Sequence, residues 1–455
     1  MLKSSLHLLL CITIADNVFC RPYAIIEGDG FKELATKLIS IGATYGKIGN
    51  VNEILPSATT VSRHLSSVVS TAKERLIKQL ESVKQFGITT DAWTHQHTND
   101  SYVTVTAQYI EDADGWYVHS QILATRIDND RHTADNIRSV VQSILEEFEA
   151  VRTGNVYITD NASNMKAAFR DATWLGCACH NLNLVLSHGL SLSARKNDGG
   201  DCGVPQEVIE LVDACKEIVT LAKRSKINNQ LETTLKQCIV TRWNSVLTTL
   251  KSVSVNLEQL QITSVTNNED KTNRKLLRLL ADIKESLLLE VIRVLEPFDT
   301  VTKCLSSDSK LTLHLVAPTK LQLAKALTLA ATDSAVVAQL KQHLRDQLER
   351  YFTIQPLHHT ATLLDPRLKN NDELLPLEAR QHAVISLRQA VSAVMDVDQP
   401  QTTQDDTPPA KKARLEDGFF ASLYDNPSSS TSSEVSICSQ LLTRFLFSSN
   451  VVMVI

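Results

Sequence analysis

The chain has 455 residues, of which 43% are apolar and 21% are charged. This length favours more than one domain, and the composition excludes a disordered, collagenous or polytopic membrane protein. Lysine and arginine number 46 against 51 aspartate and glutamate residues, which gives a net charge of -5. Overall basicity therefore gives no sign of nucleic-acid binding, and any basic surface must be local.

Nine cysteines, an odd number spread over a long chain, do not resemble the framework of a secreted disulfide protein, so we expect a reducing compartment. The first twenty residues, with Lys3 before the apolar run 6–14, imitate a signal peptide. His7 interrupts the run and no clear cleavage site follows, which favours a buried first helix over cleavage. No apolar stretch reaches the roughly 18 residues of a membrane span. We expect no membrane partner.

Near residue 86 the residue pattern changes from one typical of helices to one typical of strands. Residues 1–85 are predicted to be mainly helical, because apolar side chains recur at steps of three and four between Leu65 and Val83. Short runs rich in Val, Ile, Thr and Tyr then predict a three-stranded meander at 86–93, 102–110 and 116–125. The next predicted elements are a helix at 133–148, a strand at 155–159, a helix at 162–170 and a strand near 175–179.

Three antiparallel strands followed by parallel strands with helical crossovers are the arrangement of the RNase H-like fold, so the predicted class is α/β. Helical patterns dominate the rest of the folded chain, for example at 208–222, 276–295 and 335–352. The predicted divisions are a helical amino-terminal segment at 1–85, an RNase H-like core at 86–190, an all-α region at 191–395, and a disordered linker with an atypical carboxy terminus at 396–455.

Two aspartates end neighbouring strands of this predicted sheet. Asp91 follows the first strand, and Asp160 follows the strand after the first crossover. Side by side, the two carboxylates can converge on a pair of metal ions, the arrangement that two-metal phosphoryl transfer requires. The alternative is that each aspartate caps the helix or turn after its strand.

Six short motifs occur in a fixed order along the chain. They are TTDAWT at 89–94, TDNASNM at 159–165, CACHNLNL at 177–184, TRWNS at 241–245, LEPF at 295–298 and LLDPR at 363–367. Together they resemble the hAT superfamily of DNA transposases and the BED-zinc-finger proteins derived from it, over roughly residues 15 to 395. The resemblance implies an RNase H-like mixed sheet interrupted by a large all-α insertion, which is the region 191–395.

The resemblance also implies roles for particular residues. Asp91 and Asp160 fall on the first two metal ligands of the family's Asp-Asp-Glu triad, for which Mg²⁺ is the expected cofactor. Cys177 and His180 fall on a Cys-x-x-His element that supports the active site. Arg242 and Trp243 fall on an Arg-Trp motif, whose tryptophan is a candidate for stacking on an unpaired or flipped base. A core aromatic is the alternative for Trp243.

Two features of the family are not found in the sequence. The third carboxylate belongs to a Ser-Glu-Arg-Phe-Ser-like motif in the family's dimerisation segment, and Glu434 lacks the Arg-Phe-Ser that should follow it. The amino-terminal BED zinc finger has no counterpart either. Cys177, Cys179 and His180 do not predict a zinc site, because no second Cys/His pair stands at a finger-like distance.

Two local basic segments are candidates for binding. The linker contains a candidate nuclear localisation signal for an import receptor, formed by Lys411, Lys412 and Arg414. The alternative is a run of charged side chains that is simply exposed to solvent. Lys223 and Arg224 belong to a locally basic start of the α region, which suits a phosphate backbone. The basic residues there are Arg195, Lys196, Lys223, Arg224, Lys226, Lys271, Arg274, Lys275 and Arg278.

The sequence therefore favours a transposase-derived nuclear protein that binds DNA and regulates transcription, with a catalytically incomplete core. Its expected partners are DNA, a nuclear import receptor, and the chromatin or transcription proteins that the resemblance to domesticated members implies. The alternative is a truncated gene model of an active hAT transposase, which would carry out Mg²⁺-dependent DNA excision and strand transfer.

Overall fold

The computed structural model describes residues 28–46, 57–95, 97–111, 117–192, 203–239, 243–266, 271–307 and 310–395. The chain divides into two compact units, residues 1–75 and 76–455, which are described separately below. Within the described ranges, no helix combines the length and the apolar character needed to cross a membrane.

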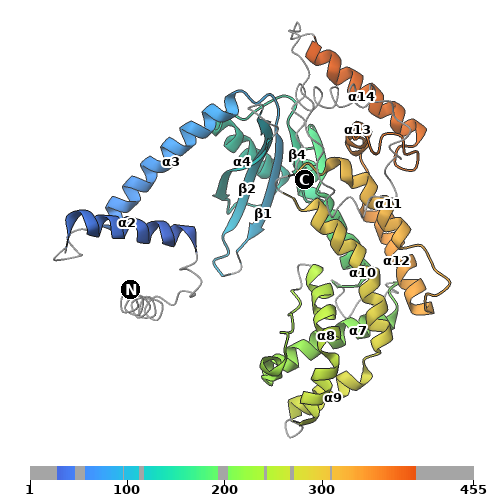
Figure 1. Ribbon diagram of the computed structural model, residues 1–455. Coiled ribbons are helices and arrows are strands. Elements are labelled where there is room, and N and C mark those ends of the chain that lie inside the picture. Colours follow the sequence, from blue (N-terminus) through green and yellow to red (C-terminus); the bar gives the residue numbers. More distant parts are fainter. Residues whose placement is uncertain are drawn as a thin grey trace. The chain divides into compact units, whose positions relative to one another are not determined.

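The first unit contains helix α2 (Asp29–Tyr45) and the first part of helix α3 (Ala58–Glu81) (Figure 1). The Ser57 hydroxyl accepts a hydrogen bond from the backbone N–H of Thr60, which is the chemistry of a helix N-cap. The predicted apolar face of α3 is buried only toward its end. Leu80 is fully buried, whereas Leu65 and Val69 are exposed, because the core that covers this face belongs to the second unit.

A five-stranded mixed sheet of order β3-β2-β1-β4-β5 organises the second unit. Its strands are β1 (Gly87–Thr94), β2 (Ser101–Glu111), β3 (Tyr117–Ile127), β4 (Val156–Thr159) and β5 (Thr173–Gly176). Strand β1 pairs antiparallel with β2 and parallel with β4, and β4 pairs parallel with β5. The predicted strands and their mixed pairing are confirmed, except that the last strand ends at Gly176, because the next helix begins at Ala178.

Different elements cover the two faces of the sheet. On one face lies α4 (Ala134–Glu147), whose N-cap Thr133 accepts from the Asn136 N–H and whose apolar stripe includes Ile137, Val141 and Ile144. The crossover from β4 to β5 is α5 (Ser163–Ala168). The opposite face receives a short 3-10 helix, η4 (Leu313–Leu315), and α13 (Pro356–Leu364).

The remaining helices pack around one large apolar core. They are α6 (Ala178–Gly189), α7 (Gln206–Arg224), η3 (Ile227–Gln230), α8 (Asn244–Thr266), α9 (Lys271–Asp282), α10 (Glu285–Leu305), α11 (Val316–Ala326) and α12 (Ala335–Tyr351). The last helix, α14 (Leu377–Met395), packs against α13 instead. Helices α7, α8 and α9 gather together at one end (Figure 1). The single helix predicted over 276–295 is wrong, since α9 ends at Asp282 and α10 begins at Glu285.

This helical region is not separate from the sheet. Leu313 of η4, with Leu357 and Ala361 of α13, packs against a small core formed by Val156, Ile158 and Leu175 of strands β4 and β5. The chain therefore leaves the sheet after β5, builds the helices from α6 to α10, and returns to the sheet. The predicted boundary at 191–395 does not follow this packing, because η4 and α13 cover the sheet itself.

Candidate functional site

Asp91 and Asp160 belong to two adjacent parallel strands: Asp91 lies within β1, and Asp160 directly follows β4. The register pairs Thr89 of β1 with Ile158 of β4. Continuing that register by two residues places Asp91 opposite Asp160, and the strand spacing puts their Cα atoms about 5 Å apart. Both side chains point to the face that η4 and α13 approach, because alternate residues of a strand share a face. The prediction that the two aspartates belong to neighbouring strands is confirmed, but Asp91 does not end its strand, because β1 continues to Thr94 in its pairing with β2.

Cys177 extends this row to the third strand. Ile158 pairs with Leu175 of β5, so the same register places Cys177 beside Asp160. The Cys177 backbone N–H donates to the Thr159 carbonyl at 2.8 Å, which fixes this position. We name Asp91, Asp160 and Cys177 the carboxylate row. Asp91 is exposed, whereas Asp160 and Cys177 are partly buried.

The negative charges of Asp160 and Asp91 contribute to the pKa of the Cys177 thiol. Burial raises the pKa of Cys177 above its usual value, backbone hydrogen bonds from His180 and Cys179 lower it, and the negative charges of Asp160 and Asp91 raise it again. Cys177 is therefore a neutral thiol at the start of α6, with its sulfur accepting from the first turn of the helix. His180, the other residue of the Cys-x-x-His element, is partly buried in that same turn.

The loop after β4 is held tightly against the row. The Asp160 carboxylate accepts from the Ala162 N–H at 3.1 Å, which is the turn-capping contact that the sequence offered as an alternative to catalysis. Asn161 donates its side-chain amide to the side-chain oxygen of Asn181 in α6. Gly176 leaves room for this contact, because a Cβ atom there would collide with the Asn161 side chain. This contact uses one of the two carboxylate oxygens of Asp160.

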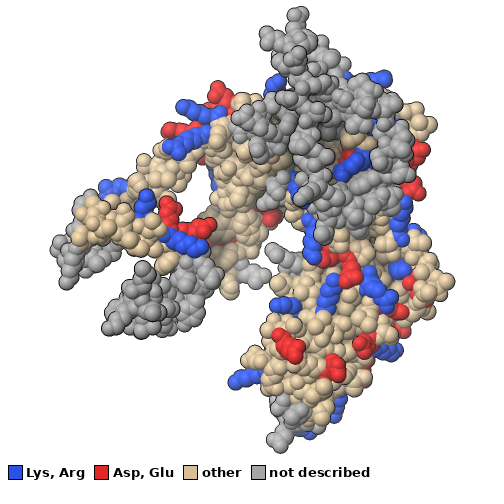
Figure 2. Space-filling model, viewed as in Figure 1, with Lys and Arg blue, Asp and Glu red and all other residues tan. Residues whose placement is uncertain are grey.

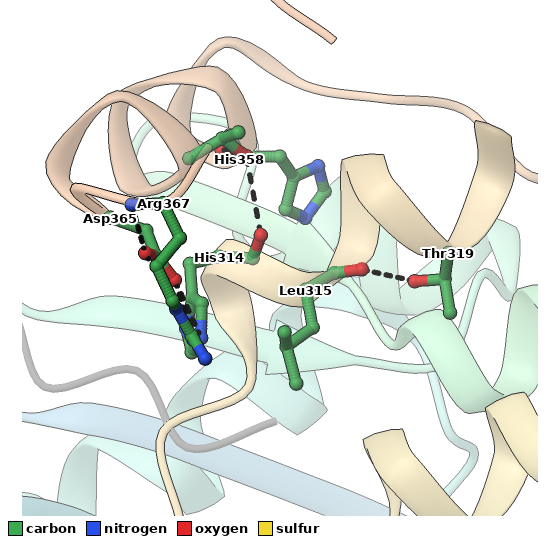
Figure 3. Close-up of polar contacts among 7 residues, drawn as sticks. His314, Leu315, Thr319, His358, Asp365 and Arg367 are labelled. Carbon is green, nitrogen blue, oxygen red and sulfur yellow. Dashed lines mark hydrogen bonds and ion pairs between the residues drawn. The ribbon is translucent and has the colours of Figure 1, made fainter. Parts of the chain in front are cut away.

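A second polar cluster lies where η4 meets α13 (Figure 3). Asp365 is buried, and its carboxylate pairs with the Arg367 guanidinium at 2.9 Å and with the His314 ring at 3.7 Å. Thr362 donates its hydroxyl to the His314 and His358 carbonyls, which ties the two elements together. This cluster contains the LLDPR motif and gives it a structural role: it fixes the elements that cover the sheet face.

The carboxylate row does not form a metal site by itself. Within the described residues, no group of three or more His, Cys, Asp or Glu side chains is arranged to hold a metal ion. Among the described residues, the row supplies the two carboxylates that the resemblance assigns to Mg²⁺, and no third acidic ligand is grouped with them.

The structure describes only some of the residues that were predicted to contact DNA. Trp243 is only 3% exposed and belongs to the helical core, and its backbone N–H lies 3.5 Å from the Asn183 side-chain oxygen. This burial favours the core-aromatic interpretation over stacking on a base. Arg242 lies outside the described residues, as do Lys411, Lys412 and Arg414 of the import signal.

Lys223 and Arg224 are exposed in the last turn of α7. Helix α9 packs beside α7, where Lys275 forms an ion pair with Glu217, and it presents Lys271, Arg274 and Arg278 along one exposed face. The structure thus brings part of the predicted basic set together. On the face shown in Figure 2, basic and acidic side chains are interspersed over the helical region.

Comparison with known proteins adds a binding region that the motifs did not reveal. Residues 10–60 match the Hermes transposase DNA-binding domain, and residues 89–173 match the ZBED1 RNase-like domain. Of residues 10–60, the structure describes 28–46 and 57–60. The sequence alone assigned no DNA-binding role to this range, where basic residues do not outnumber acidic ones and no metal-binding spacing is present.

Relatives cover most of this chain. The Hobo transposase of Drosophila melanogaster is 25% identical over 84% of this chain and 57% of its own length. Zinc finger protein 618 of Mus musculus is 29% identical over 87% of this chain and 39% of its own length. A putative AC transposase of Zea mays is 24% identical over 50% of this chain and 29% of its own length. The chain thus spans between 29% and 57% of these relatives.

Separate parts of the chain point to the same group of proteins. The mixed sheet carries two aspartates in register, residues 89–173 match an RNase-like domain, and residues 10–60 match a transposase DNA-binding domain. The relatives include both transposases and a zinc finger protein. Together, these findings support a transposase-derived protein of the hAT superfamily.

Proposed function

We propose that the protein is a transposase-derived nuclear DNA-binding protein that regulates transcription, and that its core is catalytically incomplete. One observation carries this proposal: Asp91 and Asp160 lie in register on adjacent strands, while no third metal-binding side chain joins them among the described residues. A core that retains two ligands supports the transition state of phosphoryl transfer poorly, so strand cleavage should be lost while binding is kept.

The architecture in this proposal is an RNase H-like core with an all-α insertion. Its support is the strand order β3-β2-β1-β4-β5, the RNase-like match over 89–173, and the return of η4 and α13 to the sheet after the helices α6 to α10. In this arrangement the insertion lies between β5 and η4. The match at 10–60 supports DNA as the partner of the amino-terminal segment, with Lys223 and Arg224 as an additional phosphate contact.

The nuclear assignment rests on the same kind of evidence. A DNA-binding, transposase-like chain works on nuclear DNA, and Lys411, Lys412 and Arg414 would supply import. Replacing these three residues with alanine should move a fluorescent fusion out of the nucleus. Unchanged nuclear accumulation would remove the motif from the proposal.

A cleavage assay tests the incomplete core. Purified protein should show negligible Mg²⁺- or Mn²⁺-dependent cleavage of hairpin or transposon-end DNA, and Asp91→Asn should change nothing. Cleavage that Asp91→Asn abolishes would overturn the proposal. It would favour the second candidate, an active transposase, which is supported by the retained aspartate pair and by the chain's spanning 57% of the Hobo transposase.

A salt titration tests DNA binding. Affinity for duplex DNA should fall steeply with salt, and the double change Lys223→Ala with Arg224→Ala should reduce the slope of log affinity against log salt by about two. The matched control is Lys284→Ala with Arg293→Ala, which removes two exposed basic residues, the N-cap of α10 and a residue within that helix. An equal effect of both pairs would refute the assignment of Lys223 and Arg224, and binding that does not depend on salt would refute DNA binding through phosphates.

A further inference from the structure

A groove lies between helices α7, α9 and α10, where α7 and α9 pack side by side. Its volume is about 270 Å³, and its floor is apolar, with Leu211 of α7 and Leu287 of α10 only 6% and 8% exposed. The exposed carboxylates of Glu207, Glu210 and Asp282 line its sides, and we name this site the acidic groove. Its apolar floor and charged sides suit a side chain that is apolar along its length and charged at its tip.

The carboxyl end of α9 adds further hydrogen-bond acceptors to the acidic groove. Asp282 is the last residue of α9, and Leu279, one turn earlier, also lines the groove. Within the described part of the chain, no backbone N–H from outside α9 donates to the carbonyls of residues 279–282. A helix carries a partial negative charge at its carboxyl end, so a carboxylate there is disfavoured unless a cation lies close to it. Asp282 therefore points to a cation that would bind beside it.

The described residues do not neutralise the acidic groove. Among those that line it, Lys284 is the only basic one, and it forms no ion pair with another described residue. Glu210 accepts a hydrogen bond from the Gln206 amide at 3.0 Å, which leaves its charge in place. Glu207 has a further role, since a carboxylate in the first turn of α7 stabilises that end of the helix. That role does not account for Asp282, because it stands at the opposite kind of helix end.

The charges of the acidic groove select its occupant. Three carboxylates repel a phosphate and attract a cation, so a nucleic-acid backbone does not fit here. An arginine side chain fits both parts of the groove, because its aliphatic stem can lie on Leu211 and Leu287 while its guanidinium donates to the carboxylates. The planar guanidinium carries several N–H donors, which match a set of acceptors made of carboxylate and carbonyl oxygens.

We propose that the acidic groove binds an arginine side chain in a basic segment of a protein partner. The inference goes beyond DNA binding, because it adds a partner of a different class and a second site. Lys223, the proposed phosphate contact, lies about 24 Å along α7 from Glu207, at a rise of about 1.5 Å per residue. This separation exceeds the Debye length of about 8 Å at physiological ionic strength, so the two sites bind independently.

A labelled peptide tests the acidic groove. The probe is Gly-Lys-Leu-Arg-Leu-Lys-Gly with a fluorescent label, titrated into the full chain by fluorescence anisotropy. The control probe replaces its arginine with citrulline, which keeps the shape of the side chain but not its charge. The native protein should bind the arginine probe about 5-fold to 30-fold more tightly than the citrulline probe, as expected for two exposed ion pairs. The double change Glu207→Gln with Asp282→Asn should abolish this preference.

The matched control is Glu258→Gln with Glu378→Gln, which removes two exposed carboxylates from α8 and α14 and should leave the preference intact. Asp282→Asn should not lower the melting temperature, because it removes a carboxylate from the negative end of α9. Equal affinity of the native protein for the two probes would overturn the inference, as would an equal loss in the two double variants. Duplex DNA titrated into the same proteins keeps the two proposals apart: absence of DNA binding would contradict the proposed function alone, and the peptide preference alone decides the acidic groove.

Discussion

Replacing Trp243 with alanine distinguishes a core residue from a DNA-binding residue. The ring is 3% exposed within the helical core, at the start of α8, where Val246 N–H donates to the Trp243 carbonyl at 2.8 Å. Removing a buried aromatic side chain deletes its transfer free energy and leaves a cavity, which together cost about 3 to 5 kcal/mol. The entropy of unfolding is about 2.1 cal/mol/K per residue, so a unit as long as residues 76–455 loses only about 1.3 °C of melting temperature per kcal/mol. The expected decrease is therefore roughly 4 to 7 °C.

The assay is thermal denaturation followed by circular dichroism at 222 nm, combined with DNA titration below the transition. Trp243→Phe keeps much of the buried ring and should show about half the decrease. DNA affinity measured on the folded variants should match that of native protein. A Trp243→Ala variant that melts within about 2 °C of native protein but loses DNA affinity would refute the assignment of this residue to the core.

Three further predictions concern single positions. Gly176→Ala should destabilise the loop beside Asp160 and lower the melting temperature, because the new Cβ atom would collide with the Asn161 side chain. The control Gly42→Ala adds a Cβ atom that meets nothing within 4 Å and should not lower it, so equal effects of the two changes would contradict this reasoning. Burial raises the pKa of Cys179 to about 11, so alkylation by iodoacetamide at pH 8, followed by mass spectrometry, should be far slower than in a cysteine peptide; equal rates would refute the burial. Burial lowers the pKa of His358 from 6.5 to about 4. The unfolded chain therefore binds a proton at this histidine at a higher pH than the folded protein does. As the pH drops from 6.5 toward 4, the free energy of unfolding should fall by about 1.4 kcal/mol per pH unit. Urea titrations should show a smaller fall for His358→Gln, and an unchanged slope would count against that residue.

The sheet was predictable because its signals are local. Strand-forming residues in short runs locate β1, β2 and β3 within one or two residues, and the order of strands and helices constrains the pairing. The meeting of Asp91 and Asp160 follows from that order, because parallel neighbours end at the same edge of the sheet. Both inferences use only the alternation of strands and the rules for connecting them.

The surroundings of the site were not predictable for a different reason. Helical periodicity shows that Trp243 and Leu65 lie on helices or beside them, but the side chains that cover them come from distant parts of the chain, so Trp243 is buried and Leu65 is exposed. The return of Leu357 to the sheet over 180 residues after β5 likewise has no local signal.

The junction between β5 and α6 determines how this protein can be cut into pieces. A single residue, Cys177, separates the strand from the helix, and α6 buries Leu182, Val185 and Leu186 among the helices that follow. A fragment that stops near residue 190 would uncover this stripe together with the apolar patch that η4 and α13 cover on β4 and β5. Such a fragment would aggregate through two exposed apolar surfaces. The smallest piece worth expressing for work on the two aspartates therefore runs from the end of α3 past Leu375, and includes every helix in between.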